Sequence, residues 1–137
     1  MSSRPEAQSL GAQRVISAAL ARTEEMDCLV SVVVLDAGGN MAALARQDGT
    51  AATATTIALN KANTALTVCS STDVFAGAVQ GNSMLVTSLA AQEGIALFVG
   101  GVPLMYDGVV IGAIGVSGAR DGKDLPIAQA GAAIMSS

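Results

Sequence analysis

The sequence predicts an α+β domain in which helices flank one antiparallel sheet. Helical and strand patterns follow one another in the order α-β-β-α-α-α-β-β-β-α, and two short turns join neighbouring strands. One turn is GGN at residues 38–40, and the other is Asp107–Gly108, a dipeptide that favours the two-residue type I′ hairpin. The 137 residues contain no internal repeat and no linker, so we expect a single domain over residues 1–137.

The first third of the chain predicts a helix and a hairpin. Residues 5–26 are amphipathic, with apolar side chains on one face at i, i+3 and i+4 spacing: Ala12, Val15, Ile16, Ala19 and Leu20. Residues 28–37, CLVSVVVLDA, are β-branched and almost wholly apolar, which favours a strand covered on both faces. Residues 41–46, MAALAR, then form the returning strand, and residues 47–50 form a loop.

The middle of the chain predicts three helical segments, at residues 53–69, 73–79 and 81–92. The second is preceded by SSTD, which offers N-cap residues, and the third is opened by Asn82 or Ser83. Lys61 and Asp73 are the only charged residues between Gly49 and Gln92. A helical region with so few charges seldom faces solvent. We therefore expect it in a core or in a subunit contact.

The last third predicts three strands and a helix. IALFV at residues 95–99 is a strand candidate, followed by a turn at 100–103. Strands at 103–106 and 109–118 flank the Asp107–Gly108 turn. The closing helix spans 124–135, with Asp124 where an N-cap would stand and Pro126 in its first turn.

The glycine-rich stretch DGVVIGAIGVSGARDGKD, residues 107–124, is not a nucleotide loop. Its spacing matches neither GxxxxGK[ST] nor GxGxxG. Gly112, Gly115 and Gly118 fall on alternating faces of a strand, so they line no single surface. Gly112 and Gly115 allow a helix or a ligand to approach the backbone closely. The stretch leads into a helix N-terminus, whose free N–H groups are able to hold a carboxylate or phosphate.

Charge and composition exclude several classes of function. The net charge is −4 and aromatic residues make up 2%, so neither phosphate neutralisation nor base stacking on nucleic acid is supported. Hydrophobic residues make up 51%, yet no uncharged apolar run is long enough to cross a membrane. The N-terminus has no apolar signal core, so we expect a cytoplasmic protein. Because only 13% of residues are charged, we expect other subunits to cover part of the surface.

The chain has no histidine, which removes the commonest general base, metal ligand and haem ligand. A Ser-His-Asp or Cys-His pair is therefore impossible. Cys28 and Cys69 stand alone without a CxxC motif, so we expect no metal site.

Two charged groups are candidates for chemistry. A desolvated Lys61 is suited to act as a base or Schiff-base former. Alternatively, it reaches the surface or pairs with Asp36 or Asp48. Arg46 and Asp48, at the end of the second strand, either anchor an anionic ligand or form a surface ion pair.

Three segments resemble the GlcG/HbpS family, also described as the haem-binding, PduO C-terminal-like domain. They are VSVVVLDAGGNMAALARQDG, ALNKANTAL and GGVPLMYDGVVIGAIGVSGARDGKDLPIAQAG, within a resemblance that covers residues 10–135. The resemblance implies a profilin-like fold with a five-stranded antiparallel sheet, and homo-oligomers from dimers to octamers. It also implies haem bound beside the sheet in some members. Where those members use histidine, this chain offers Tyr, Cys, Met or a weak oxygen ligand.

The favoured function is an oligomeric protein that binds a small molecule, either a haem-like ligand or another hydrophobic or organic acid. The motif positions assigned to ligand binding are Asp36, Gly100, Gly101, Ser117 and Asp124. The alternative is a cofactor-independent lyase, isomerase or hydratase with Lys61, Arg46 and Asp48 as catalytic residues. In that case Arg46 would hold a carboxylate, and Asp48, Asp36 or Asp124 would move a proton. A third possibility is an accessory subunit without a site of its own.

Overall fold

The structure is a computed structural model that describes residues 9–135. The predicted residues 5–8 of the first helix lie outside the described residues. The helices are α1 (Ser9–Met26), α2 (Ala54–Val68), α3 (Thr72–Val79), α4 (Ser83–Ala90) and α5 (Asp124–Ala132). The strands are β1 (Ser31–Asp36), β2 (Met41–Arg46), β3 (Gly101–Tyr106) and β4 (Val109–Ser117). They form one antiparallel sheet in the order β2-β1-β4-β3, so the predicted α+β class is confirmed.

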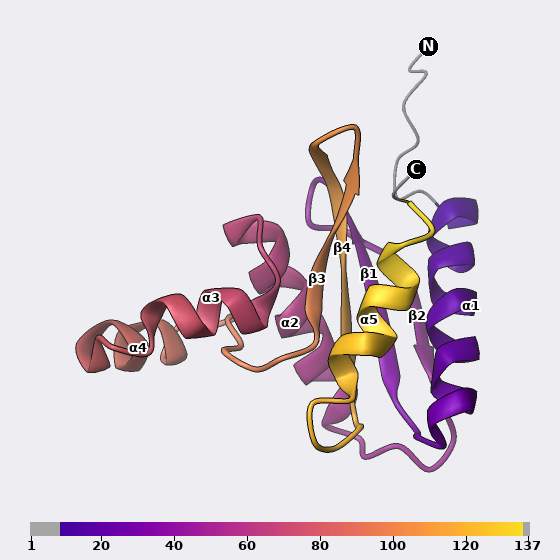
Figure 1. Cartoon of the computed structure of the whole chain (residues 1–137), viewed down its shortest axis with the longest axis horizontal. Helices are drawn as coiled ribbons and strands as arrows, with labels where there is room; N and C mark the ends of the chain where they lie inside the picture. The colour runs from indigo at the N-terminus through magenta and orange to yellow at the C-terminus, as the bar shows by residue number, and fades with distance from the viewer. Residues whose placement is uncertain (1–8, 136–137) are drawn as a thin grey trace.

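Helices cover both faces of the sheet (Figure 1). Helices α1 and α5 lie on one face, over a core that includes Val32, Val34, Ile114 and Ile127. Helix α2 lies on the other face, over Val33, Leu35 and Ala113. This arrangement explains why β1 is apolar at consecutive positions rather than alternating, because each face of the strand contacts a helix.

Glycine in β4 lets α2 lie directly on the sheet. A Cβ atom added at Gly115 would lie 1.9 Å from the Ala58 carbonyl oxygen of α2. One at Gly101 of β3 would lie 2.3 Å from the Lys61 carbonyl oxygen. The prediction that a β4 glycine permits close approach of a helix is therefore confirmed at Gly115.

The two predicted hairpin turns are confirmed. Asp107 and Gly108 have φ values of 53° and 76°, and the residues that flank them, Tyr106 and Val109, are paired. In the β1–β2 turn, Asp36 Oδ1 accepts hydrogen bonds of 2.9 Å from the backbone N–H groups of Gly38 and Asn40. Asp36 therefore closes a turn.

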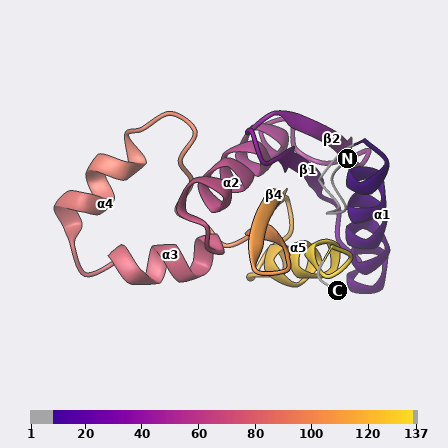
Figure 2. The same ribbon diagram turned by 90° about the horizontal axis from the view of Figure 1, so that it is seen from above.

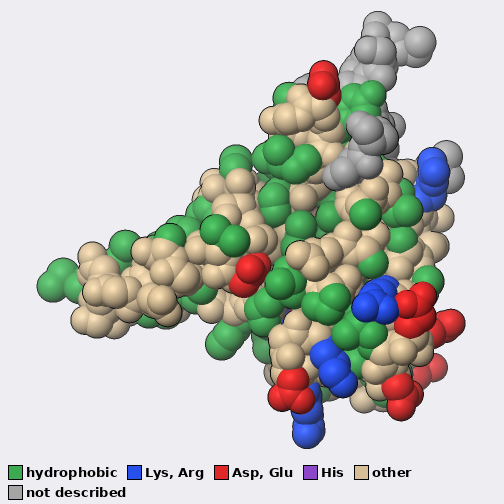
Figure 3. Space-filling model, viewed as in Figure 1, with side chains coloured by type: hydrophobic (Ala, Val, Ile, Leu, Met, Phe, Trp, Pro, Cys, Tyr) green, Lys and Arg blue, Asp and Glu red, His purple; other side chains and the backbone are tan. Residues whose placement is uncertain are grey.

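Helices α3 and α4 project from the sheet as an arm, defined here as residues 72–99 (Figures 1 and 2). No residue of α4 is buried, although the helix is mostly apolar. Large hydrophobic side chains are exposed on the arm: Val74, Met84, Leu85 and Phe98. Figure 3 shows acidic and basic side chains gathered on the lower right of the body, whereas on the arm hydrophobic side chains lie among uncharged atoms.

The predicted strand at residues 95–99 is wrong, and the sheet has four strands rather than five. Side chains of α2 and α3 hold this segment instead. The Ala96 N–H donates to Thr64 Oγ1 at 2.9 Å, and the Thr72 hydroxyl donates to the Phe98 carbonyl oxygen. The turn predicted at 100–103 is also wrong, because β3 already begins at Gly101.

The ends of the helices differ in detail from the prediction. Asn82 is the N-cap of α4, and its side chain accepts from the Leu85 N–H at 3.0 Å. Asp124 is the first residue of α5 rather than its N-cap, which is Lys123. Helix α5 ends at Ala132, before the predicted residue 135. Between residues 9 and 135, no helix is long and apolar enough to cross a membrane.

Candidate functional site

A buried ion pair lies where β4, α2 and α5 meet. Lys61 Nζ lies 3.0 Å from Asp124 Oδ2 and donates a hydrogen bond of 2.9 Å to the Val116 carbonyl oxygen. The other carboxylate oxygen of Asp124 accepts from the Ala119 N–H at 2.9 Å. The side chains of Lys61 and Asp124 are only 4% and 9% exposed. Each charge is thus paired and hydrogen-bonded, as a buried charge requires.

Gly100 makes room for this pair. Its φ of 127° lies in a region that residues with a Cβ atom rarely adopt. A Cβ atom there would lie 2.5 Å from the Val116 carbonyl oxygen and 3.0 Å from Lys61 Nζ. The two glycines Gly100 and Gly101 therefore have a steric role: they let β3 begin against α2 and the ion pair.

A row of polar side chains crosses one end of the sheet. Ser31 of β1 is paired with Arg46 of β2 on one side and with Ser117 of β4 on the other. Ser117 is buried, and Ser31 Oγ lies 2.9 Å from Thr55 Oγ1 at the start of α2. The exposed Arg46 donates to the Thr50 carbonyl oxygen at 2.5 Å. Arg46 thereby stabilises the loop that follows its own strand.

The structure brings together some of the predicted site residues and separates others. Lys61, Asp124, Gly100 and Gly101 converge. Ser117 follows Val116, whose carbonyl accepts from Lys61, and it lies in the same cross-strand row as Arg46. Asp36 lies at the opposite end of β1 from Ser31.

The predicted partners of Lys61, Asp36 and Asp48, are wrong, because its partner is Asp124. Asp48 is exposed, and within residues 9–135 neither it nor Arg46 takes part in an ion pair. The surface pair of Arg46 with Asp48 is therefore wrong as well.

The geometry of Lys61 favours a structural role over an amine that attacks a substrate. To act as a base or Schiff-base former, the amine would have to leave both the carboxylate of Asp124 and the carbonyl of Val116. Three cavities lie on the arm and beside β3 and α5, and none of them is lined by Lys61, Arg46 or Asp48. The alternative of a lyase, isomerase or hydratase thus gains no support from the arrangement of these residues.

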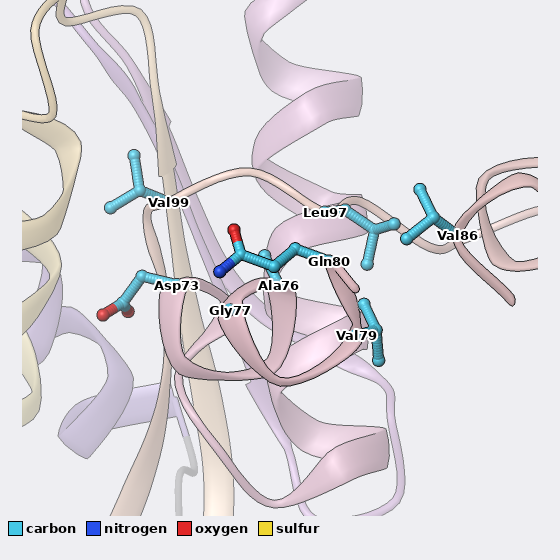
Figure 4. A pocket seen from close by; sticks show the side chains of 8 residues that line it. All are labelled: Asp73, Ala76, Gly77, Val79, Gln80, Val86, Leu97 and Val99. Atoms are coloured by element: carbon cyan, nitrogen blue, oxygen red, sulfur yellow. The ribbon is translucent and has the colours of Figure 1, made fainter. Parts of the chain in front are cut away.

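Two cavities lie along the arm. The larger, here called the arm cavity, has a volume of about 500 Å³. It is lined by residues of α3 and α4 and by the returning chain: Asp73, Ala76, Gly77, Val79, Gln80, Val86, Leu97 and Val99 (Figure 4). A second cavity of about 200 Å³ lies beside α2 and includes Ile57, Asn60 and Leu97. The sequence predicted no site in this region, although its scarcity of charged residues was a sign that its surface is apolar.

A third cavity, here called the β3–α5 cavity, has a volume of about 450 Å³ and is shallow and open. It is lined by Ser71, Val102, Pro103, Met105, Gln129, Ala132 and Ala133. Most of these side chains are apolar, and Met105 supplies a thioether. Both this cavity and the arm cavity fall within the range of roughly 300–1,000 Å³ that is usual for small-molecule sites.

The donor set of these cavities fits a haem in part. The walls of the β3–α5 cavity are apolar, as the ring requires, and Met105 is a possible axial ligand for the iron. None of the three cavities is lined by a lysine or arginine, so the two propionates would have to face water. A metal ion held directly by protein side chains normally needs at least three His, Cys, Asp or Glu ligands close together. The described part of the chain contains no group of three such residues.

Comparison with known proteins places this arrangement in a family. The family described as "Haem degrading protein HbpS-like" has a model that matches residues 9–133. A 15.0 kDa protein from the dhaT–dhaS intergenic region of Citrobacter freundii is 37% identical over 119 residues, which cover 86% of this chain and 84% of that protein. Protein GlcG of Escherichia coli K12 is 36% identical over 109 residues, 77% of each chain.

A solved structure shares both the fold and a moderate sequence identity. The crystal structure of a complex of PduOC with haem has a TM-score of 0.85 and 26% identity, and the match covers 95% of each chain. The sequence resemblance to the GlcG/HbpS family is thereby confirmed. The chain belongs to the HbpS-like family.

Proposed function

We propose that this chain is an oligomeric small-molecule-binding protein whose ligand is haem or another flat, apolar molecule. The observation that carries the proposal is the β3–α5 cavity, which combines apolar walls with the thioether of Met105. A haem complex of the related PduOC supports haem as the first ligand to test. Because no lysine or arginine lines the cavity, any acidic groups of the ligand would remain in water rather than pair with the protein.

Self-association is the second part of the proposal. Met84 is 79% exposed, and α4 has no buried residue, so the arm leaves a large apolar surface uncovered in a single chain. An exposed apolar patch of this kind commonly marks a contact with another protein surface. A second copy that covers the arm would remove this surface from water, as closed homo-oligomers commonly do.

Titration of the purified chain with haemin tests ligand binding. We expect a shifted Soret band that saturates at a fixed ratio of haem to chain. Replacement of Met105 by leucine keeps the apolar volume but removes the thioether, so the position of the band should change. Met41→Leu is the matched control, because Met41 lies on β2 and lines none of the three cavities.

Two results would contradict the proposal in different ways. If haemin uptake does not saturate and other flat apolar molecules also fail to bind, the chain is not a binding protein of this kind. If binding saturates but Met105→Leu and Met41→Leu give the same spectrum as the unaltered chain, the ligand lies outside the β3–α5 cavity.

A further inference from the structure

Residues 95–99 form a segment of strand-like sequence that has no strand partner within the chain. The segment, IALFV, is rich in β-branched and aromatic residues, yet it takes no regular secondary structure. Within residues 9–135, the backbone N–H groups of Leu97, Phe98 and Val99 donate no hydrogen bond. A row of unpaired backbone donors on an apolar segment is what an added strand pairs with.

The apolar side chains of residues 95–99 are partly exposed or line cavities, so covering the segment would remove apolar surface from water. Phe98 is 65% exposed, the largest exposed fraction among the apolar side chains of this segment. Leu97 lines both the arm cavity and the 200 Å³ cavity, and Val99 lines the arm cavity. Figure 4 shows that Leu97 and Val99 come from the same returning segment, with Val86 of α4 next to Leu97. Apolar hollows therefore lie beside the unpaired backbone.

The charge of the arm narrows the choice of partner. The arm carries two charges, on Asp73 and Glu93, and the segment itself carries none. Without lysine or arginine the arm has no attraction for nucleic acid or for an anionic membrane surface. A neutral apolar strand is complementary to another of the same kind, and a two-fold axis pairs identical strands in the antiparallel direction.

We propose that residues 95–99 pair antiparallel with the same residues of a second copy, and that this pairing forms the centre of the interface between copies. A two-fold axis at Phe98 places Leu97 of each chain opposite Val99 of the second copy. Neighbouring residues of a strand direct their N–H groups to opposite sides, and the Phe98 carbonyl already accepts from Thr72. The N–H groups of Leu97 and Val99 therefore face the second copy and join the new ladder, whereas that of Phe98 does not. The inference rests on the proposed self-association and specifies which segment carries it.

Two measurements on the full chain test this interface. Sedimentation equilibrium over a wide concentration range gives the dissociation constant between copies. Hydrogen exchange at low and high concentration reports on the amides of Leu97, Phe98 and Val99. We expect the amides of Leu97 and Val99 to exchange slowly only at concentrations at which the copies associate, because these two donate across the ladder and that of Phe98 does not.

Phe98→Asp and Phe98→Lys place a charge on the proposed axis. Each should weaken association by about 30-fold or more, the effect of a central interface residue. Leu44→Asp is the matched control, since Leu44 is an exposed leucine (47%) on the edge strand β2, and it should leave the constant within about threefold. Circular dichroism checks that each variant keeps its fold.

Each outcome supports or overturns the inference. A chain that is monomeric at every concentration overturns self-association and this interface together. An oligomer in which the Leu97 and Val99 amides exchange rapidly, or that resists both Phe98 variants, retains self-association but has its interface elsewhere. Monomers whose amides are protected only by uncharged lipid vesicles would identify a lipid surface as the partner instead.

Discussion

Lys61 of α2 and Asp124 of α5 form an ion pair of 3.0 Å between two helices that cover opposite faces of the sheet. Both side chains are more than nine-tenths buried. The pair is anchored further by the carbonyl of Val116 and the N–H of Ala119, so it ties α2 to the end of β4, to the loop after it and to the start of α5. Removing either partner would leave the other as an unpaired charge in the core.

Replacement of Lys61 by methionine should therefore destabilise the fold strongly. The free energy of unfolding is expected to fall by about 3–5 kcal/mol, the usual cost of breaking a buried pair. Urea denaturation measures the change. Arg22→Met is the control, because Arg22 pairs with Glu25 on the surface and its loss should cost at most about 1 kcal/mol.

A double variant tests whether Lys61 stabilises the fold through its pairing with Asp124. With Asp124→Asn present, Lys61→Met no longer leaves a carboxylate unpaired, so its additional cost should be clearly smaller than in the unaltered chain. Equal costs in both backgrounds would show that the two residues do not act as a pair. A Lys61→Met chain of unchanged stability would contradict the structural role and return Lys61 to the catalytic candidates.

The sequence was informative about Lys61 but not about its partner. A lone lysine in a neutral helix indicates an unusual environment, and Lys61 is indeed buried. Asp36 and Asp48 were the expected partners, whereas the observed partner Asp124 is 63 residues away. The partner lies at the start of α5, which covers the opposite face of the sheet from α2. Residue spacing along one helix carries no information about such a long-range contact.

The sheet was predictable where its signals are local. The type I′ turn at Asp107–Gly108 depends on two adjacent residues, and the burial of β1 depends on its continuous apolar run. The segment 95–99 was a strand candidate, and tertiary contacts from Thr64 and Thr72 outweigh its β propensity. The cavities were not predictable, because each combines residues from segments distant in sequence.

Gly115→Ala should be among the most damaging small substitutions in the chain. The added methyl group would lie 1.9 Å from the Ala58 carbonyl oxygen and 2.7 Å from the Ala62 nitrogen, so α2 would have to move off the sheet. Overpacking of this kind costs about 1–3 kcal/mol, and occasionally more, in urea denaturation.

Gly77→Ala is the matched control for Gly115→Ala. Gly77 lies within α3, and a Cβ atom there would meet no heavy atom within 4 Å. Alanine should stabilise that helix by about 0.5–1 kcal/mol, because it restricts the unfolded chain more than glycine does. If both substitutions had the same effect, the close contact between α2 and β4 would not exist in solution.

Asn82→Ala should weaken α4 without changing the stability of the whole domain. The Asn82 side chain accepts from the Leu85 N–H, and loss of an N-cap costs about 1 kcal/mol. Because α4 has no buried residue, the loss should appear as faster hydrogen exchange within α4. Asn82→Asp retains the acceptor and should exchange like the unaltered chain. A lower midpoint of urea unfolding for Asn82→Ala would instead show that α4 unfolds together with the sheet.

Asp73→Ala should stabilise the chain or leave its stability unchanged, although it removes an acidic residue from the first turn of α3. Asp73 Oδ1 is buried and has no hydrogen-bond partner among the described residues, and such an atom costs about 1–3 kcal/mol. The favourable interaction of the carboxylate with the helix dipole is smaller, about 0.3–1 kcal/mol. The expected result lies between no change and a gain of about 2 kcal/mol in urea denaturation, the difference between these two contributions. Asp73→Asn removes the charge but keeps one oxygen acceptor, so it separates the dipole effect from that of a buried acceptor. A loss of stability in Asp73→Ala that is restored in Asp73→Asn would mean that the buried oxygen accepts a hydrogen bond in solution.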